Sequence, residues 1–178
     1  MYFRLIQLSS GTSGTLRRIT PSHYVKFEVK TFGTMTSEHT NLLHLTTGED
    51  GNGDPIVHGE RIPGAWFMTE STKLFISTSL NNNDDYIILP PDSLPLNQYT
   101  EVEIYQKIDG NNQYKYEIKI AGNLIHSAIN SNPLTFSNVK VYSGDPWYET
   151  RQAYIKNLVI GPFEGMIFGS NKGIRDEI

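Results

Sequence analysis

Hydrophobic and polar residues alternate along much of this chain. In the segment HYVKFEVKTF (residues 23–32), Val25, Phe27 and Val29 fall on one side, and charged residues fall on the other. Successive side chains of a β-strand point to opposite faces, so this pattern predicts a strand with one buried and one solvated face. No stretch keeps the 3.6-residue period of an amphipathic helix, and we therefore expect an all-β protein.

Further segments show the same alternation and are separated by turn residues. The sequence DGNN (109–112) predicts a tight hairpin, because Gly and Asn accept the positive φ of such turns. The segments 138–143 and 153–161 are expected to pair as a second hairpin around GDPWYET. The remaining predicted strands lie at 40–48, 64–69, 73–80, 86–90, 98–108, 113–122 and 123–130.

About ten to twelve short strands at this spacing are typical of an antiparallel two-sheet sandwich of the jelly-roll type. We expect residues 1–178 to form a single domain, since the sequence contains neither an internal repeat nor a low-complexity linker. The core is predicted over about residues 22–162. The terminal segments SSGTSGT and GMIFGSNKGIRDEI either add edge strands or fray.

Composition narrows the classes of function. The formal net charge is −4 and the longest basic run is Arg17-Arg18, so a nucleic acid is not an expected partner. The chain has no cysteine, which excludes disulfide bonds, thiolate metal sites and a cysteine nucleophile. No apolar stretch approaches the roughly 20 residues that a membrane-spanning helix needs.

The segment GDPWYET carries two aromatic residues between two predicted strands. Asp145 precedes a proline and favours a turn, and Trp147, Tyr148 and Glu149 follow. An exposed aromatic ring stacks on the apolar face of a sugar or anchors a protein partner. In the alternative interpretation, Trp147 caps one end of the sandwich and plugs its core, which leaves Tyr148 as the better candidate for exposure.

A second group of polar residues lies in TTGEDGNGDPIVHGE. Asp50, Asn52 and Asp54 match the first three ligands of the helix-loop-helix calcium template. The template then fails, because Pro55 stands where its glycine belongs and Arg61 occupies the twelfth position. An EF-hand is therefore excluded.

Two interpretations of this acidic segment stay open. It forms a calcium site on the rim of the jelly roll, with Asp145 joining from a neighbouring loop, or it is a solvated turn rich in Asp and Gly. Bound calcium would also imply an extracellular location.

Signatures of an enzyme are mostly absent. Glycoside hydrolysis requires two suitably spaced carboxyl groups, and the nearest candidates are Glu101 and Glu103 in TEVEIY. Val102 and Ile104 alternate with them and supply the core, so both glutamates are expected on the wet side of an outer sheet. The histidines match no zinc motif, and His44 is interpreted as an ordinary strand residue.

Three short motifs follow one another along the second half of the chain. YTEVEI (99–104) fits the pattern W/Y-T-x-V-x-I, an AGN turn follows, and IKNLVI (155–160) fits the closing pattern I-x-N-L-x-I. In this order they resemble the laminin-G/concanavalin A-like jelly-roll superfamily, in particular its animal extracellular laminin-G-like domains. The resemblance covers about residues 22–162. It implies two antiparallel sheets and recognition of a ligand, in a superfamily of lectins, adhesion modules and some glycan-cleaving enzymes.

We therefore expect a secreted or extracellular domain without catalytic activity. Its predicted partner is a glycan or glycoprotein, contacted through Trp147, Tyr148, Asp145 and Glu149, with calcium shaping the loops where it binds. One alternative is a protein–protein adhesion module, including homo-oligomeric assembly, that binds no glycan. The second alternative is a glycan-active enzyme.

Overall fold

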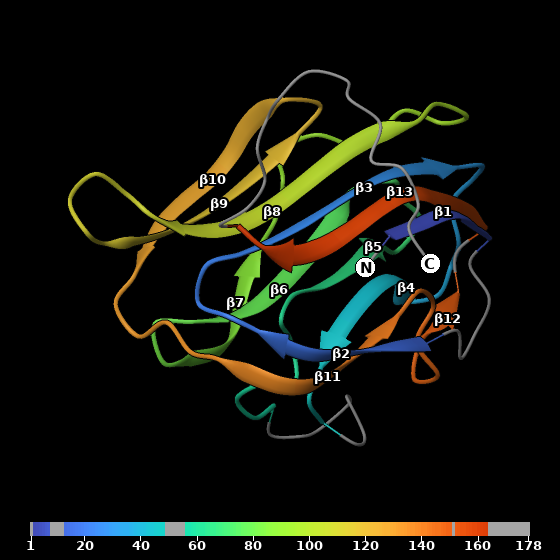
Figure 1. Ribbon diagram of the computed structural model, residues 1–178. Helices are drawn as coiled ribbons and strands as arrows, with labels where there is room; N and C mark the ends of the chain where they lie inside the picture. Colours follow the sequence, from blue (N-terminus) through green and yellow to red (C-terminus); the bar gives the residue numbers. More distant parts are fainter. Residues whose placement is uncertain (1, 8–12, 49–55, 151, 164–178) are drawn as a thin grey trace, which may run out of the picture.

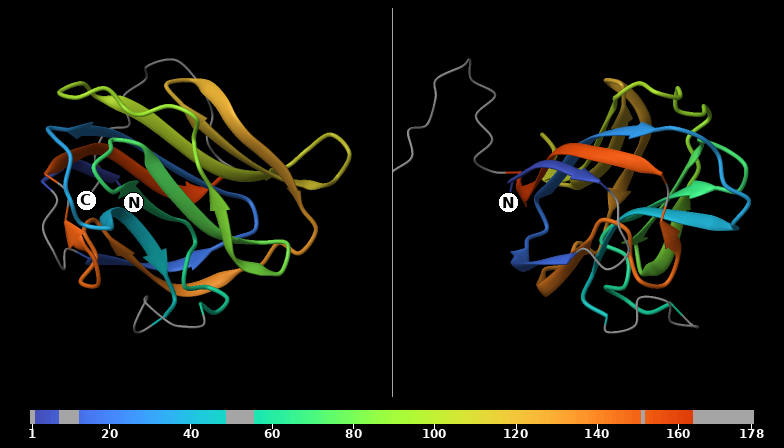
Figure 2. Two further views of the ribbon diagram at one scale, coloured as in Figure 1. Left: turned by 180° about the vertical axis from the view of Figure 1, so that it is seen from behind. Right: turned by 90° about the vertical axis from the view of Figure 1, so that its right-hand side faces the viewer.

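The computed structural model describes residues 2–7, 13–48, 56–150 and 152–163, and these residues form strands, turns and loops without any helix. The strands build two sheets that stack as two layers (Figure 1; Figure 2, right). In the six-stranded sheet the order is β1 (Tyr2–Gln7), β13 (Ala153–Pro162), β3 (His23–Thr31), β8 (Thr100–Ile108), β9 (Tyr114–Ile120) and β10 (Asn123–Asn130). No helix of the described residues is long and apolar enough to span a membrane.

The seven-stranded sheet forms the other layer. Its order is β2 (Ser13–Ile19), β11 (Phe136–Tyr142), β4 (His39–Thr46), β5 (Gly64–Met68), β6 (Leu74–Leu80) and β7 (Asn83–Ile88), and the short β12 (Glu149–Thr150) pairs with β4. The β12–β4 pair is parallel, whereas every other named strand pair is antiparallel. The predicted antiparallel jelly-roll sandwich is confirmed.

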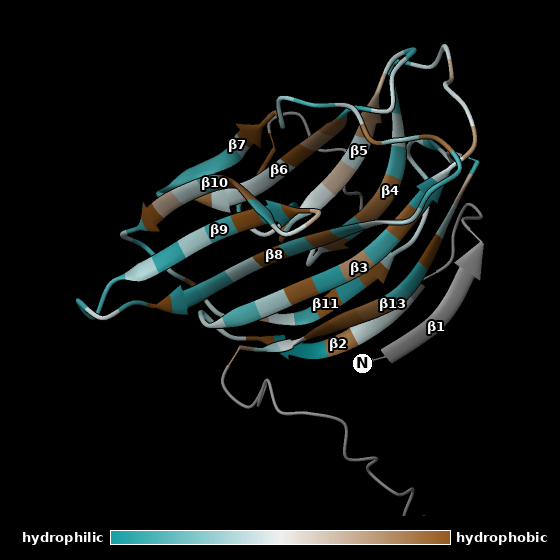
Figure 3. Ribbon diagram, turned by 90° about the horizontal axis from the view of Figure 1, so that it is seen from above, coloured by the Kyte–Doolittle hydropathy of each residue, from teal (hydrophilic) through white to brown (hydrophobic). Residues whose placement is uncertain are grey.

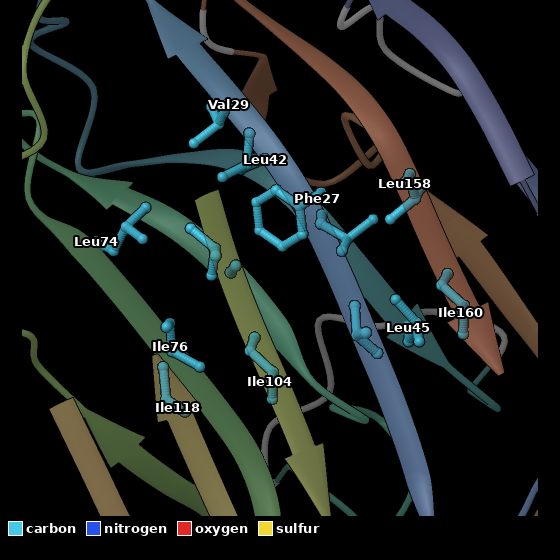
Figure 4. Packing of buried hydrophobic residues seen from close by; sticks show 14 of the residues in the cluster. Phe27, Val29, Leu42, Leu45, Leu74, Ile76, Ile104, Ile118, Leu158 and Ile160 are labelled. Atoms are coloured by element: carbon cyan, nitrogen blue, oxygen red, sulfur yellow. The ribbon is translucent and has the colours of Figure 1, made fainter. Parts of the chain in front are cut away.

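The core fills the space between the two sheets, as the alternation predicted. Val25, Phe27 and Val29 of β3 are buried there, opposite Leu42 and Leu45 of β4 (Figure 4). Burying a side chain of this size contributes roughly 1.5–3 kcal/mol relative to leaving it exposed. The two apolar faces therefore hold the layers together.

Hydrophilic and hydrophobic residues alternate along β3 and β8 (Figure 3), and the hydrophilic ones include the charged residues of the outer face of the six-stranded sheet. Lys26 Nζ lies 2.6 Å from Glu101 Oε2 and 3.2 Å from Glu103 Oε1, and the intervening Val102 and Ile104 are buried in the core. The prediction that both glutamates face outward is confirmed. They belong to an ion-pair network on an open sheet surface.

The hairpin predicted around DGNN is present between β8 and β9. Asp109 Oδ1 accepts hydrogen bonds from the backbone N–H groups of Asn111 (2.8 Å) and Gln113 (3.0 Å). Asn112 adopts a φ of 60°, the left-handed conformation that Asn tolerates. The turn residues therefore act here as the sequence suggested.

The second predicted hairpin is wrong. β11 pairs with β2 and β4 in the seven-stranded sheet, whereas β13 pairs with β1 and β3 in the six-stranded sheet. The chain leaves β11 after Tyr142, passes over the outer side of β4, and pairs with β4 again as β12 before it crosses to the other layer (Figure 1). Local alternation describes each strand but not the distant strand with which it pairs.

Candidate functional site

The candidate site lies on the outer face of the seven-stranded sheet, the face turned away from the core. Directly opposed residues of an antiparallel pair point to the same face. Asn41 lies opposite Trp66, and Trp66 lies opposite Phe75. Because Ala65 and Phe67 pack in the core, Trp66 between them points outward.

Trp66 is the centre of this face, although its ring is almost completely buried. The ring lies across Gly64, where an added Cβ would overlap its six-membered part. The rings of His44, Tyr148 and Phe75 pack edge-on around it, with centroids 5.2, 5.8 and 5.9 Å away. Edge-to-face contacts at these separations are favourable, so the cluster fixes the position of each ring.

The aromatic loop, residues 143–148, covers one side of this cluster between β11 and β12. Gly144 has a φ of 85°, which allows the sharp turn at the start of the loop. The side-chain oxygen of Asn41 accepts hydrogen bonds from the backbone N–H groups of Gly144 (3.1 Å) and Asp145 (3.0 Å). A buried residue of β4 thus fixes the start of the loop.

Asp145 forms the second attachment, and its side chain is fully buried. Its Oδ1 accepts hydrogen bonds from the backbone N–H groups of Trp147 (3.2 Å) and Tyr148 (3.0 Å). Its Oδ2 lies 2.9 Å from Nδ1 of His44, whose Nε2 lies 2.6 Å from the carbonyl oxygen of Glu60. Both ring nitrogens of His44 therefore face oxygen atoms, which fixes the orientation of the ring.

The two rings of the aromatic loop are half-buried. Trp147 packs edge-on against Tyr142 and His44, with centroids 5.2 and 5.7 Å apart. Tyr148 packs against Trp66. Trp147 therefore does not plug the core, as one interpretation held, because it lies on the outer face of the sheet. Each ring keeps part of its surface open to solvent.

Arg61 covers the Trp66 ring from the segment that precedes β5. Its guanidinium carbon lies 5.1 Å from the ring centroid of Trp66, a cation–π arrangement. Its Nη1 donates hydrogen bonds to Ser77 (3.2 Å) and Asp85, and Ser77 also donates to Asp85. The ion pair with Asp85 compensates the charge of Arg61, which is mostly buried.

The predicted ligand-binding residues differ in their exposure to solvent. Trp147 and Tyr148 lie together, and the exposed Glu149 next to them accepts a hydrogen bond from the Ser37 hydroxyl. Asp145 is placed in the interior and not at the surface where we expected it. Its two side-chain oxygens contact Nδ1 of His44 and the backbone N–H groups of Trp147 and Tyr148. It is a positioning residue of the aromatic loop.

The predicted calcium ligands Asp50, Asn52 and Asp54 lie outside the described residues. The described part of the chain contains no group of three or more His, Cys, Asp or Glu residues that could hold a metal ion. Asp145 does not fit the part of an exposed rim ligand, since its oxygens are occupied by His44 and by backbone N–H groups. Calcium binding by the acidic segment stays a prediction.

Sequence reasoning missed four residues of this site: Asn41, His44, Arg61 and Trp66. Alternation does place His44 on the face opposite Leu43, but it cannot show that a loop 101 residues away covers that face. The GAWF sequence contains the one usable signal. Gly64 lies two residues before Trp66 on the same strand face, and because it has no side chain the Trp66 ring can pack flat against its backbone.

Comparisons with known proteins identify the fold. No family model and no curated protein matches this chain. Solved structures do match: the CBM40 of the Ruminococcus gnavus IT-sialidase, bound to α2,3-sialyllactose, has a TM-score of 0.60 at 13% identity and covers 90% of both chains.

Two further solved structures match this chain at the same sequence identity. The heptameric SAP-like pentraxin of Limulus polyphemus has a TM-score of 0.55 at 13% identity, over 89% of this chain and 70% of the pentraxin. The endo-β-1,4-glucuronan lyase of Trichoderma reesei has a TM-score of 0.52 at 13% identity, over 89% of this chain and 79% of the lyase. The chain thus shares the two-sheet jelly-roll fold of these structures. The narrower laminin-G resemblance stays a prediction.

Proposed function

We propose that this domain is a noncatalytic, extracellular recognition module that binds carbohydrate on the outer face of its seven-stranded sheet. Trp147 and Tyr148 stack on the sugar, and Glu149 beside them accepts hydrogen bonds from its hydroxyl groups. One observation carries the proposal: two half-exposed aromatic rings are fixed on a loop whose anchors, Asn41 and Asp145, are both buried.

Rigid placement favours binding for a physical reason. A ring that is already ordered loses little conformational entropy when a ligand packs on it, so more of the contact free energy appears as affinity. The contact of Trp147 with His44 and that of Tyr148 with Trp66 provide this order. The sialyllactose-bound CBM40, which shares the fold, supports the choice of ligand class.

A glycan array tests the proposal. The wild-type protein is expected to bind a restricted set of glycans, and Trp147→Ala and Tyr148→Ala are expected to lose that binding while they keep the melting temperature within a few degrees. Tyr114→Ala is the matched control, because Tyr114 is half-buried at the start of β9 and lies outside the cluster. Retention of the same glycans by both loop variants would contradict the proposal.

Protein–protein assembly is the second candidate, and a specific observation favours it. The edge strands β7 and β10 expose Ile87 and Leu124, with 47% and 53% of their surfaces accessible. Exposed apolar side chains on open sheet edges are typical of surfaces that pair with another chain. A monomeric mass in light scattering that is the same for wild type and Leu124→Lys would contradict this candidate.

A further inference from the structure

A pocket of about 640 Å³ lies apart from the aromatic loop, beside the outer face of the six-stranded sheet. One wall is the proline-rich connection between β7 and β8, with Leu94 and Tyr99, and the opposite wall includes Ile120 and Ile125 at the β9–β10 turn. Pockets that hold small ligands have volumes of about 300–1,000 Å³ and largely apolar walls with a few polar groups. This pocket has the size and the lining of a ligand site.

The polar lining has an unusual balance of hydrogen-bond donors and acceptors. Its charged members are the carboxylates Glu28, Asp92 and Glu101, and the described lining includes no Lys, Arg or His. Gln98 and Asn123 add amide groups, which both donate and accept. The hydroxyl groups of Ser93, Tyr99 and Thr100 likewise donate and accept, so the three carboxylates are the groups that can only accept.

Two of the carboxylates are fixed in place. Glu28 and Glu101 lie directly opposite each other on β3 and β8, where two negative charges repel. Lys156 Nζ lies 3.1 Å from Glu28, and Lys26 Nζ lies 2.6 Å from Glu101, so each carboxylate has its own lysine. Neither lysine is part of the pocket lining, although Lys156 Nζ lies 3.9 Å from the ring centroid of the lining residue Tyr99 and Lys30 Nζ lies 4.9 Å from it.

Glu28 is also ionised at neutral pH. Burial alone would raise the pKa of Glu28, but hydrogen bonds from Asn157 and Lys156 hold it below the ordinary 4.5. Each carboxylate oxygen has two lone pairs, so a carboxylate that is paired with one lysine still accepts further hydrogen bonds. The pocket thus offers fixed acceptors next to apolar walls.

We propose that this pocket is a second ligand site and that it takes a sugar rich in hydrogen-bond donors, either neutral or amine-bearing, and rejects acidic sugars. Sugar hydroxyls and an ammonium group donate to the carboxylates, and the side chains of Ile125 and Pro91 pack on the apolar side of the ligand. An acidic sugar would place its own carboxylate next to Asp92, which makes no ion pair with the described residues, and next to Glu28 and Glu101, whose lysines lie outside the lining. The site lies on the six-stranded sheet and is therefore independent of the proposed site on the seven-stranded sheet.

Two sites on different sheets would make the single domain bivalent. A bivalent domain holds two glycan chains at once, which raises the apparent affinity for a dense glycan surface without any new contact.

Galactose, galactosamine and galacturonic acid are suitable probes, because they differ in the group that decides the proposal. Each is titrated at equal concentration into the whole protein while methyl NMR signals are followed. Galactose or galactosamine is expected to shift the methyl signals of Ile120 and Ile125, and galacturonic acid is not. The methyl signal of Ile108, exposed at the far end of β8, is the internal control.

Variants separate this site from other effects. Ile125→Trp fills the pocket and is expected to weaken binding at least about tenfold, equivalent to about 1.4 kcal/mol, whereas the matched Ile108→Trp leaves it unchanged. The exposed Asp92→Lys adds a donor and is expected to turn the preference toward galacturonic acid. Trp147→Ala is expected to leave all these shifts unchanged. The experiment can therefore support the pocket even where the proposed glycan site at the aromatic loop is wrong, and the reverse.

Three outcomes would overturn the proposal. The first is that no probe shifts the signals of Ile120 and Ile125. The second is that galacturonic acid shifts them as strongly as galactosamine does. The third is that galactosamine shifts the Ile120 signal of Ile125→Trp as in the wild type, or that galacturonic acid shifts no signal of Asp92→Lys.

Discussion

Asp145 and His44 are 101 residues apart in the chain and meet in the interior, where Oδ2 of the first lies 2.9 Å from Nδ1 of the second. Neither side chain is exposed. The other oxygen of Asp145 holds the backbone of Trp147 and Tyr148. One buried carboxylate therefore connects the central strand β4 to the two rings that we assign to ligand binding.

Removal of this carboxylate is expected to destabilise the protein and to release the aromatic loop. Asp145→Ala leaves a ring nitrogen of His44 and two backbone N–H groups without their acceptor, and each buried donor left unsatisfied costs about 1–3 kcal/mol. Urea denaturation measures the loss of unfolding free energy. Loss of the Trp147 and Tyr148 amide signals from their native NMR positions reports the release of the loop.

Glu149→Ala is the matched control for that variant. Glu149 is an acidic residue of the same region but is exposed, so its removal is expected to change stability by no more than about 0.5 kcal/mol. Equal losses for Asp145→Ala and Glu149→Ala would show that the buried pair does not hold the loop.

Gly64→Ala is expected to disrupt the aromatic cluster around Trp66. The new methyl group would overlap the Trp66 ring, which is packed on its other sides by His44 and Tyr148 and cannot move freely. Overpacking of this kind typically costs about 1–3 kcal/mol. Thermal unfolding measures the loss, and Gly33→Ala, at a position with open space around it, is expected to be near neutral. A Gly64→Ala protein as stable as Gly33→Ala would contradict the packing described here.

Stability is expected to fall as the pH drops below 6.5. Burial lowers the pKa of His23 and His126, although hydrogen bonds to Thr20 and Pro21 partly offset the effect at His23. Near pH 6.5 the unfolded chain therefore begins to bind protons that the folded protein does not, and the unfolding free energy falls by up to about 1.4 kcal/mol per pH unit for each histidine. Above pH 6.5 this dependence disappears.

Urea denaturation between pH 7.5 and about 5 measures the slope, and the upper end of that range is the reference. A His23→Gln/His126→Gln double variant is expected to show a flatter dependence over the same range. The window ends above the region where Glu28 and Glu117 titrate, since the pKa of each lies below 4.5. An unchanged slope in the double variant would assign the effect to other groups.

Calcium is expected to raise the melting temperature if the acidic segment binds it, because a ligand of the folded state stabilises that state. The size of the rise follows the calcium concentration. Asp50→Asn and Asp54→Asn are expected to abolish it, and a rise that persists in both variants would place the calcium ligands elsewhere. Magnesium at equal concentration is the control cation.

Most strands and the β8–β9 turn were predictable because each depends on residues that are neighbours in the sequence. The alternation in residues 23–32 identifies the buried face of β3, and Asp109 with Asn112 identifies the β8–β9 turn, since both signals depend on neighbouring residues. The error at residues 138–161 has the same origin. Pairing across the sandwich depends on distant strands, so the crossing of β13 to the other sheet is not encoded in the segment itself.

The site was less predictable, for a related reason. Trp147 and Tyr148 were noticeable as aromatic residues near a turn, but their support comes from Asn41, His44 and Trp66, which are far away in sequence. Burial of a polar side chain on an outer sheet face requires a covering loop, and the sequence does not show which loop covers which face. The sequence therefore identified the two candidate aromatic residues, but it did not identify the distant residues that hold them in place.

The indole N–H signals provide the most direct test of carbohydrate binding at the aromatic loop. The chain contains two tryptophans, the buried Trp66 and the half-exposed Trp147, and each gives one such NMR signal. With a glycan selected on the array, we predict a saturable shift that is largest for Trp147 and absent from the Tyr148→Ala spectrum. A glycan that binds at saturation and leaves the Trp147 signal in place would contradict the account.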